Sequence, residues 1–255
     1  LTDFDDESKE RIAADKLSSK PKKKKPGFIE SFKIIFSSNY LGLIAILVLC
    51  YGITANLAEV TWKGQFKRWC ASDVLYKKMN GLFFIFTGLF TMFLGLFLRN
   101  MVSLFGWLIS SLMTPIILLI TSVLFYVFLL YSKFIMPLEY HAYILITVVI
   151  LGAIQNIFSK GVKYCLFDPT LQLAYSPLDD ETRIPGKAAV DVIGGRVGKA
   201  MGSGIQVATV AMLGSQLASA PIFLFCILLF GFVWVLGVFA LSKQYYFLKE
   251  KEDAE

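Results

Sequence analysis

Residues 221–241 read PIFLFCILLFGFVWVLGVFAL, an apolar stretch that contains no charged side chain. A helix needs about 20 mainly apolar residues to cross the roughly 30 Å hydrocarbon core of a bilayer. A helix over this stretch is long enough and apolar enough to do so. The stretch therefore predicts a membrane-spanning helix, and with it an integral membrane protein.

The composition of the whole chain supports the same fold class. Of its 255 residues, 56% are hydrophobic and 17% are charged, whereas soluble domains carry about 25% charged residues. We predict an all-α membrane protein with a six-transmembrane-helix bundle, and we expect a kink at Pro115. The expected spans are Tyr40–Val60, Met79–Leu98, Leu104–Tyr131, Tyr140–Val162, Lys187–Leu213 and Pro221–Leu241.

The segments around these spans are polar. Residues 1–26 are charged and Lys-rich, which predicts a solvated linker. Residues 28–36 predict an interfacial helix or the lead-in to the first span. We expect a polar connection over Trp62–Lys78 and a polar loop over Asp168–Gly186, which holds three prolines, and residues 246–255 read as a charged tail.

The distribution of basic residues predicts the orientation. A Lys cluster at residues 20–25 precedes the first span. Such a cluster can bind nucleic acid, but beside a hydrophobic span it is typical of a cytoplasmic anchor, so we expect no nucleic-acid partner. With six spans, both ends of the chain then lie in the cytoplasm or stroma. Five basic residues fall on the opposite, outer side, where they can draw in an anionic solute: Lys63, Lys67, Arg68, Lys77 and Lys78.

Metal and cofactor sites are not expected. The four cysteines are scattered without CxxC spacing and the chain has a single histidine, whereas zinc sites use clustered N and S ligands. The sequence thus predicts neither a metal nor a cofactor.

Ionisable residues inside spans are costly in lipid and are functional candidates for that reason. The first span ends with Glu59 and Lys63, which are four residues apart and can pair. They form either an interfacial ion pair or a gate that faces a water-filled cavity, and position alone does not choose between the two. The fourth span places Asn156, Lys160 and Lys163 on one face, where the lysines can also extend to the interface.

The predicted fifth span is too polar to face lipid. It carries Lys187, Asp191, Arg196, Lys199 and Gln206. Arg196 and Lys199 are one turn apart, and two cations of this kind can hold phosphate oxygens. Gly194, Gly198 and Gly202 repeat every four residues, which is typical of close helix packing.

The Gly198-Lys199 pair is not a P-loop. The GxxxxGK[ST] pattern needs Gly where Ile193 stands, and Ser or Thr where Ala200 stands. Any phosphate contact in this segment therefore comes from side chains in a helical bundle.

Two stretches resemble a known family. Residues 56–63 read NLAEVTWK, and residues 159–206 read SKGVKYCLFDPTLQLAYSPLDDETRIPGKAAVDVIGGRVGKAMGSGIQ. Both are similar to signatures of the ATP/ADP translocases of plastids and obligate intracellular bacteria, and the likeness covers residues 28–245. The sequence departs from the pattern at Leu171 and Gln172, where the family commonly has Lys-Glu.

The resemblance implies a major-facilitator-like transporter of two six-helix halves, of which residues 27–245 are similar to the C-terminal half. Residues 1–26 are then the interdomain linker, and the N-terminal half is a partner. The implied location is a bacterial inner membrane or the plastid inner envelope. The resemblance further implies counter-exchange of ATP for ADP, with phosphate as a further candidate substrate, and it implicates Glu59 and Lys199 in transport.

From these observations we expect Lys199, Arg196, Lys160 and Asn156 to bind the substrate. Glu59, Lys63 and Asp191 are expected to gate or couple transport, with Glu59 pairing with Lys63 or Lys199 in the empty site. A proton-coupled nucleotide importer of the same family is the alternative.

Two other classes are disfavoured. An enzyme would need paired carboxylates or a positioned base, and the acidic run at residues 179–181 is more simply a solvated loop. A purely structural bundle would not need charges along its fifth span.

Overall fold

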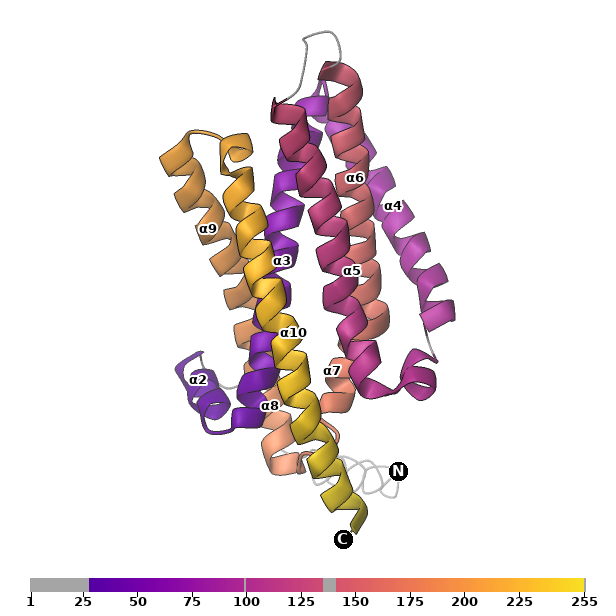
Figure 1. The fold of residues 1–255 in the computed structure, drawn as a ribbon, viewed down its shortest axis with the longest axis vertical. Helices are drawn as coiled ribbons and strands as arrows, with labels where there is room; N and C mark the ends of the chain where they lie inside the picture. Colours follow the sequence, from indigo (N-terminus) through magenta and orange to yellow (C-terminus); the bar gives the residue numbers. More distant parts are fainter. Residues whose placement is uncertain (1–27, 99, 135–140, 255) are drawn as a thin grey trace, which may run out of the picture.

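The computed structural model describes residues 28–98, 100–134 and 141–254, and its secondary structure in these ranges is helical (Figure 1). The elements are α2 (Phe28–Phe36), α3 (Asn39–Trp69), α4 (Asp73–Leu98), α5 (Met101–Phe134), α6 (His141–Val162), η2 (Lys163–Phe167), α7 (Asp168–Ala174), α8 (Asp180–Val192), η3 (Ile193–Val197), α9 (Gly198–Leu213) and α10 (Gln216–Ala254). The elements η2 and η3 are single π-helical turns.

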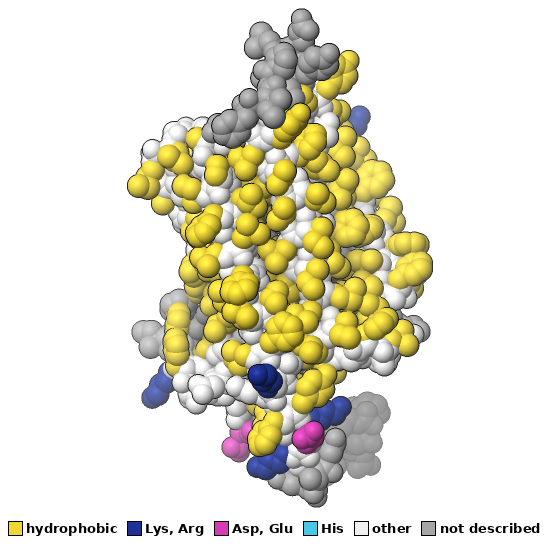
Figure 2. All heavy atoms as spheres, in the orientation of Figure 1, with side chains coloured by type: hydrophobic (Ala, Val, Ile, Leu, Met, Phe, Trp, Pro, Cys, Tyr) yellow, Lys and Arg dark blue, Asp and Glu magenta, His cyan; other side chains and the backbone are white. Residues whose placement is uncertain are grey.

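Five helical stretches in the described ranges are long and apolar enough to cross a membrane: Asn39–Trp69, Asp73–Leu98, Met101–Ser132, Tyr143–Ala174 and Gln216–Lys251. Apolar side chains cover the long middle part of the face shown in Figure 2, and charged side chains gather at the end that holds the C-terminus. Both observations confirm an integral membrane bundle of helices.

The predicted fifth span, Lys187–Leu213, is not one of these five stretches. The structure divides it among α8, η3 and α9, and α9 has only 16 residues. Charged side chains on α8, η3 and the first turn of α9 interrupt the apolar character of this segment. In Figure 1 the segment nevertheless runs beside α3 and α10 along the bundle. The number of six spans therefore stays a prediction.

Helix α3 forms the centre of the bundle. It packs against α6, α9 and α10, and its side chains Leu41, Ile44, Ile53 and Leu57 are almost fully buried. Helix α4, in contrast, packs on α6 and η2 and leaves most of its apolar side chains exposed. A central α3 brings residues of the first and fourth predicted spans and of α9 to one place.

Two details of the sequence prediction were wrong. The expected connection over Trp62–Lys78 begins as helix, because α3 continues to Trp69 and buries Trp62 and Phe66. These rings stack with centroids 5.1 Å apart, so apolar packing extends the helix beyond the predicted span.

The expected loop over Asp168–Gly186 is mainly helical. Pro169 lies in the first turn of α7, where a missing N–H costs little. The Asp179 carboxylate accepts a hydrogen bond from the backbone N–H of Thr182 at 3.1 Å and so caps the start of α8. Prolines and acidic residues at these positions begin helices.

Helix α5 is interrupted at Gly106, which the sequence analysis did not predict, and the kink expected at Pro115, inside the same helix, stays a prediction. Gly106 has φ +77° and ψ 172°, and a residue without a Cβ adopts this conformation at little cost. The first turn of α5 consequently leaves the axis of the rest of the helix (Figure 1).

Helix α2 and the C-terminal end of α10 lie at the same end of the bundle (Figure 1). Helix α2 covers the same residues, 28–36, for which the sequence predicted a helix. The predicted linker, residues 1–26, lies outside the described residues.

Candidate functional site

A carboxylate held between two lysines joins α3 to α6. The Oε1 atom of Glu59 lies 2.8 Å from Nζ of Lys63 and 3.4 Å from Nζ of Lys160. The pair with Lys63, one turn along α3, is the pair expected from the sequence. In place of the alternative partner Lys199, the second cation is Lys160 from α6.

The aromatic rings of α4 also contact Lys160. Its ammonium lies 5.3 Å from the ring centroid of Phe83 and 5.1 Å from that of Phe84, within the range of cation–π attraction. The side chains of Glu59 and Lys160 are 29% and 22% exposed. They are thus partly shielded and still within reach of a solute, and they bring α3, α4 and α6 together.

Amide side chains connect α3 to α9 one turn before Glu59. The hydroxyl of Ser203 donates to Oδ1 of Asn56 at 3.3 Å, and the amide of Gln206 donates to the carbonyl oxygens of Asn56 and Leu57, each at 3.3 Å. Gln206 is buried. These bonds satisfy polar groups that would otherwise be costly in an apolar bundle.

Glycines allow this close approach of α3 and α9. A Cβ added to Gly198 would lie 3.2 Å from Cα of Gly52, and one added to Gly202 would lie 2.8 Å from Oδ1 of Asn56. A Cβ on Gly194 would clash with the side chain of Val48. The predicted small-residue face is therefore the face that packs against α3.

Asn156 and Lys163 continue the polar face of α6. Asn156 is buried, and its amide nitrogen donates to the carbonyl of Gly152 at 2.9 Å, so it does not point to an open surface. Lys163 pairs with Asp168 at 2.7 Å, and its ammonium lies 6.0 Å from the ring centroid of Tyr51 on α3. Of the predicted substrate contacts on α6, Lys160 is the more accessible.

Arg196 and Lys199 occupy the exposed side of η3 and α9. Within residues 28–98, 100–134 and 141–254, neither side chain forms a hydrogen bond or an ion pair. The two cations are therefore available to a ligand, but they are not joined to the cluster around Glu59.

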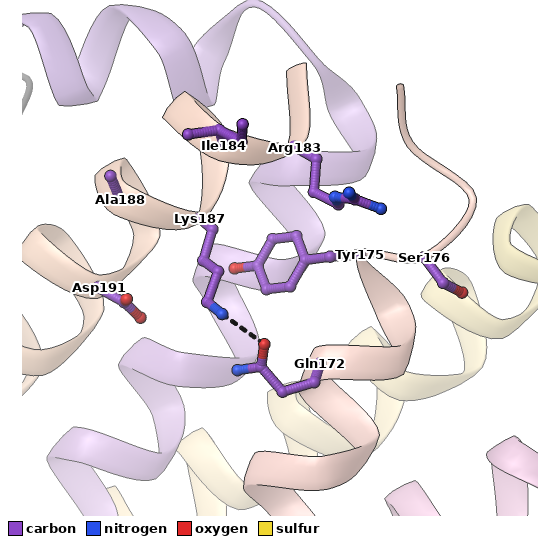
Figure 3. A pocket seen from close by; sticks show the side chains of 8 residues that line it. All are labelled: Gln172, Tyr175, Ser176, Arg183, Ile184, Lys187, Ala188 and Asp191. Carbon is purple, nitrogen blue, oxygen red and sulfur yellow. Dashed lines mark hydrogen bonds between the residues drawn. The ribbon is translucent and has the colours of Figure 1, made fainter. Parts of the chain in front are cut away.

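Asp191 lies elsewhere, in a hollow of about 490 Å³ that α7 and α8 line near the end that holds α2 (Figure 3). In this hollow the ammonium of Lys187 donates to Oε1 of Gln172 at 2.6 Å. The hydroxyl of Tyr175 is buried and has no hydrogen-bond partner among the residues that the structure describes. Burial, together with the nearby Asp191 carboxylate, raises the pKa of the Tyr175 phenol, which therefore stays neutral.

The charges of this hollow between α7 and α8 are nearly balanced. Arg183 pairs with Asp180, and the carboxylate of Asp191 accompanies the ammonium of Lys187. A balanced set of charges gives little net attraction for a polyphosphate. The expected gating residue Asp191 lines this hollow, whereas the expected phosphate contacts Arg196, Lys199, Lys160 and Asn156 do not.

The sequence reasoning missed the two π-helical turns. Lys163 lies in η2 and Arg196 lies in η3, so each turn carries one of the cations discussed above. Single π-turns within α-helices are frequent at functional sites, because they redirect side chains locally. The glycine pair Gly194-Gly195 in η3 was the available signal, but glycine is just as consistent with close packing.

Metal ligands do not gather in the described part of the chain, where no three His, Cys, Asp or Glu side chains form a group that could hold an ion. The chemistry available is that of lysines, an arginine, a carboxylate and amides on neighbouring helices. Such a set suits an anionic solute with several oxygen atoms.

The known proteins that this chain resembles are named for anionic solutes of this kind. Residues 5–245 match the family described as TLC ATP/ADP transporter. ADP,ATP carrier protein 1 of Chlamydia muridarum is 37% identical over 245 residues, which are 94% of this chain and 46% of that protein. ADP,ATP carrier protein 3 of Rickettsia prowazekii is 38% identical over 88% of this chain and 45% of its own length.

A plant relative gives the same result. ADP,ATP carrier protein 1, chloroplastic, of Arabidopsis thaliana is 38% identical over 93% of this chain and 39% of its own length. The chain thus spans less than half the length of these curated relatives, and no solved structure matches it. The resemblance read from residues 56–63 and 159–206 is confirmed, and the chain belongs to the TLC ATP/ADP transporter family, a family of transporters and not of enzymes.

Proposed function

We propose that the protein exchanges ATP for ADP across a membrane by alternating access, and that this chain supplies the C-terminal six-helix half of a major-facilitator-like transporter. The observation that carries the proposal is the contact of Glu59 with Lys63 and Lys160 on the central helices. A carboxylate between two partly exposed lysines lowers the energetic cost of their positive charges in an apolar bundle while no substrate is bound.

In this proposal the phosphates are held by cationic side chains. Lys199 and Arg196 are proposed to bind the phosphates, because both are exposed and have no partner among the described residues. Lys160 joins them when a phosphate oxygen replaces the Glu59 carboxylate, and Asn156 contributes after a local rearrangement. Because ATP carries one more negative charge than ADP, a flexible set of cations suits both substrates better than a rigid metal site.

The N-terminal half is the proposed partner, and it closes the cavity from the other side. The exposed side of α9 supports this arrangement, since Arg196 and Lys199 need a hydrated chamber and not lipid. Rocking of the two halves then exposes the site alternately. Glu59, Lys63 and Asp191 are proposed to gate or couple this motion.

The proposed location is a bacterial inner membrane or a plastid inner envelope, with both chain ends in the cytoplasm or stroma. The position of α2 and the C-terminal end of α10 at one end of the bundle supports the part of this proposal that places them on the same side of the membrane.

The test is uptake of labelled ATP into liposomes that contain the full-length protein. Vesicles loaded with ADP should take up ATP much faster than empty vesicles, because exchange needs a counter-substrate. Lys199→Ala should abolish uptake while membrane insertion stays normal, and Lys249→Ala, at the far end of α10, should behave as wild type. Normal uptake by the Lys199 variant would contradict the assignment.

A further inference from the structure

A second open hollow lies at the end of the bundle opposite α2, where α3 ends and α10 begins (Figure 1). It has a volume of about 520 Å³, and its lining includes Lys63, Lys67, Arg68, Tyr76 and Gln216. The amide of Gln216 donates to the carbonyl of Val60 at 3.3 Å and so fixes the start of α10 against α3. The hollow is thus built from the ends of three helices.

The charge of this hollow is strongly unbalanced. Lys67 and Arg68 are exposed, and the hydrogen bond of Arg68 goes to the neutral amide of Gln65. Lys77 and Lys78 follow within the first two turns of α4, and the acidic residues of α3 and α4 are Glu59 and Asp73. The excess of cations distinguishes this hollow from the balanced one between α7 and α8.

Lys63 connects the hollow to the candidate site. The same ammonium lines the hollow and lies 2.8 Å from the Glu59 carboxylate. An anion in the hollow therefore competes with Glu59 for Lys63. When Lys63 turns to the anion, Glu59 keeps its second partner, Lys160, which lies 3.4 Å away.

We propose that this hollow is a collecting site for the polyphosphate of the incoming nucleotide, and that the nucleotide passes inward as Lys63 exchanges Glu59 for a phosphate oxygen. The inference rests on the proposed nucleotide exchange and adds the residues that capture the substrate. It also gives a physical reason for basic residues on the side where membrane proteins usually have few. A cleft lined by charges of one sign raises the local concentration of an oppositely charged solute.

The test compares initial rates of ATP uptake by the full-length protein in ADP-loaded phosphatidylcholine vesicles. The double variant Lys67→Gln/Arg68→Gln should raise the KM for ATP about fivefold to tenfold at low ionic strength. At about 0.5 M salt the difference should shrink to about twofold, because exposed charges are then screened within a few ångströms. The KM for ADP, which carries less charge, should change less.

The matched control removes two exposed cations from the opposite end of the bundle, as Lys249→Gln/Lys251→Gln. This variant should keep the wild-type KM. An unchanged KM in the Lys67/Arg68 variant, or an equal change in the control, would overturn the collecting site. An effect that required anionic lipid in the vesicles would assign these cations to lipid headgroups and would overturn it too.

A second measurement does not depend on transport. In a Cys70→Ser background, Lys67→Cys should react with a negatively charged thiol reagent, and pyrophosphate should slow this reaction about tenfold. A cysteine at Lys249 should show no such protection. Lack of protection at position 67 would refute the collecting site, whereas a wild-type protein that exchanges no nucleotide would refute the proposed function itself.

Discussion

The Glu59 carboxylate on α3 lies 3.4 Å from the Lys160 ammonium on α6, although 101 residues separate them in the sequence. The same carboxylate oxygen lies 2.8 Å from Lys63, so one acidic group pairs with two cations from different helices. Because an unpaired charge in an apolar bundle is costly, a ligand that takes one lysine must leave Glu59 with the other. This relationship makes Lys160 the first residue to test.

Lys160→Ala should lower the exchange rate strongly, whereas Lys160→Arg should retain a substantial part of it, because arginine keeps the positive charge. In a double-mutant cycle with Glu59→Gln, the coupling energy for stability should be about 1 kcal/mol, as for partly exposed ion pairs. Thermal unfolding in detergent measures the coupling, and ADP-loaded liposomes measure the exchange. Independent, additive effects of the two substitutions would show that the pair is not energetically linked.

The packing of α9 on α3 gives a prediction about stability. Gly198→Ala should destabilise the protein by about 1–3 kcal/mol, because its Cβ would lie 3.1 Å from the Leu49 carbonyl and 3.2 Å from Cα of Gly52, both backbone atoms. Gly204→Ala in the same helix is the matched control, since no neighbouring atom of the described residues lies within 4 Å of its added Cβ. That variant should be neutral or slightly more stable. Equal melting temperatures for the two variants would contradict the close approach.

The sequence predicted those features that depend on local pattern. Apolar runs identified the long helices, the four-residue spacing of Glu59 and Lys63 predicted their pair, and the glycine repeat predicted a packing face. Each of these follows from the geometry of a single helix.

The features that the sequence did not predict depend on contacts between helices or on the local pattern of backbone hydrogen bonds. The partner of Glu59 on α6 is set by how the helices cross, and no spacing rule selects Lys160 over Lys199. The polar stretch after Phe167 looked like a loop, yet Pro169 and Asp179 begin helices there. The two π-turns differ from α-helix by one hydrogen-bond step, and residue type does not specify that difference.

Within the stretch NLAEVTWK, Trp62 is a buried packing residue, and we expect its substitution to act mainly on stability. Its side chain is 1% exposed, and its indole N–H donates to the carbonyl of Val149 at 3.0 Å. Trp62→Phe should cost about 1–2 kcal/mol of stability through the lost hydrogen bond, and Trp62→Ala about 3–5 kcal/mol through the cavity. Leu96→Ala, at an exposed position on α4, is the control and should change stability little. Thermal unfolding in detergent checks these values, and a Trp62→Ala protein as stable as wild type would exclude the buried position.

Exchange and proton-coupled import differ in what drives them. One-for-one exchange of ATP for ADP moves one net negative charge, and one charge crossing 100 mV corresponds to about 2.3 kcal/mol. A potential of about 60 mV, positive inside, should therefore increase the equilibrium accumulation of ATP in ADP-loaded vesicles about tenfold, by the same conversion. Dissipating a pH gradient with a protonophore, with the potential held constant by potassium and valinomycin, should leave this exchange almost unchanged. Uptake that instead stopped with the pH gradient and ignored the potential would favour the proton-coupled importer, with Glu59 as the group that takes up the proton.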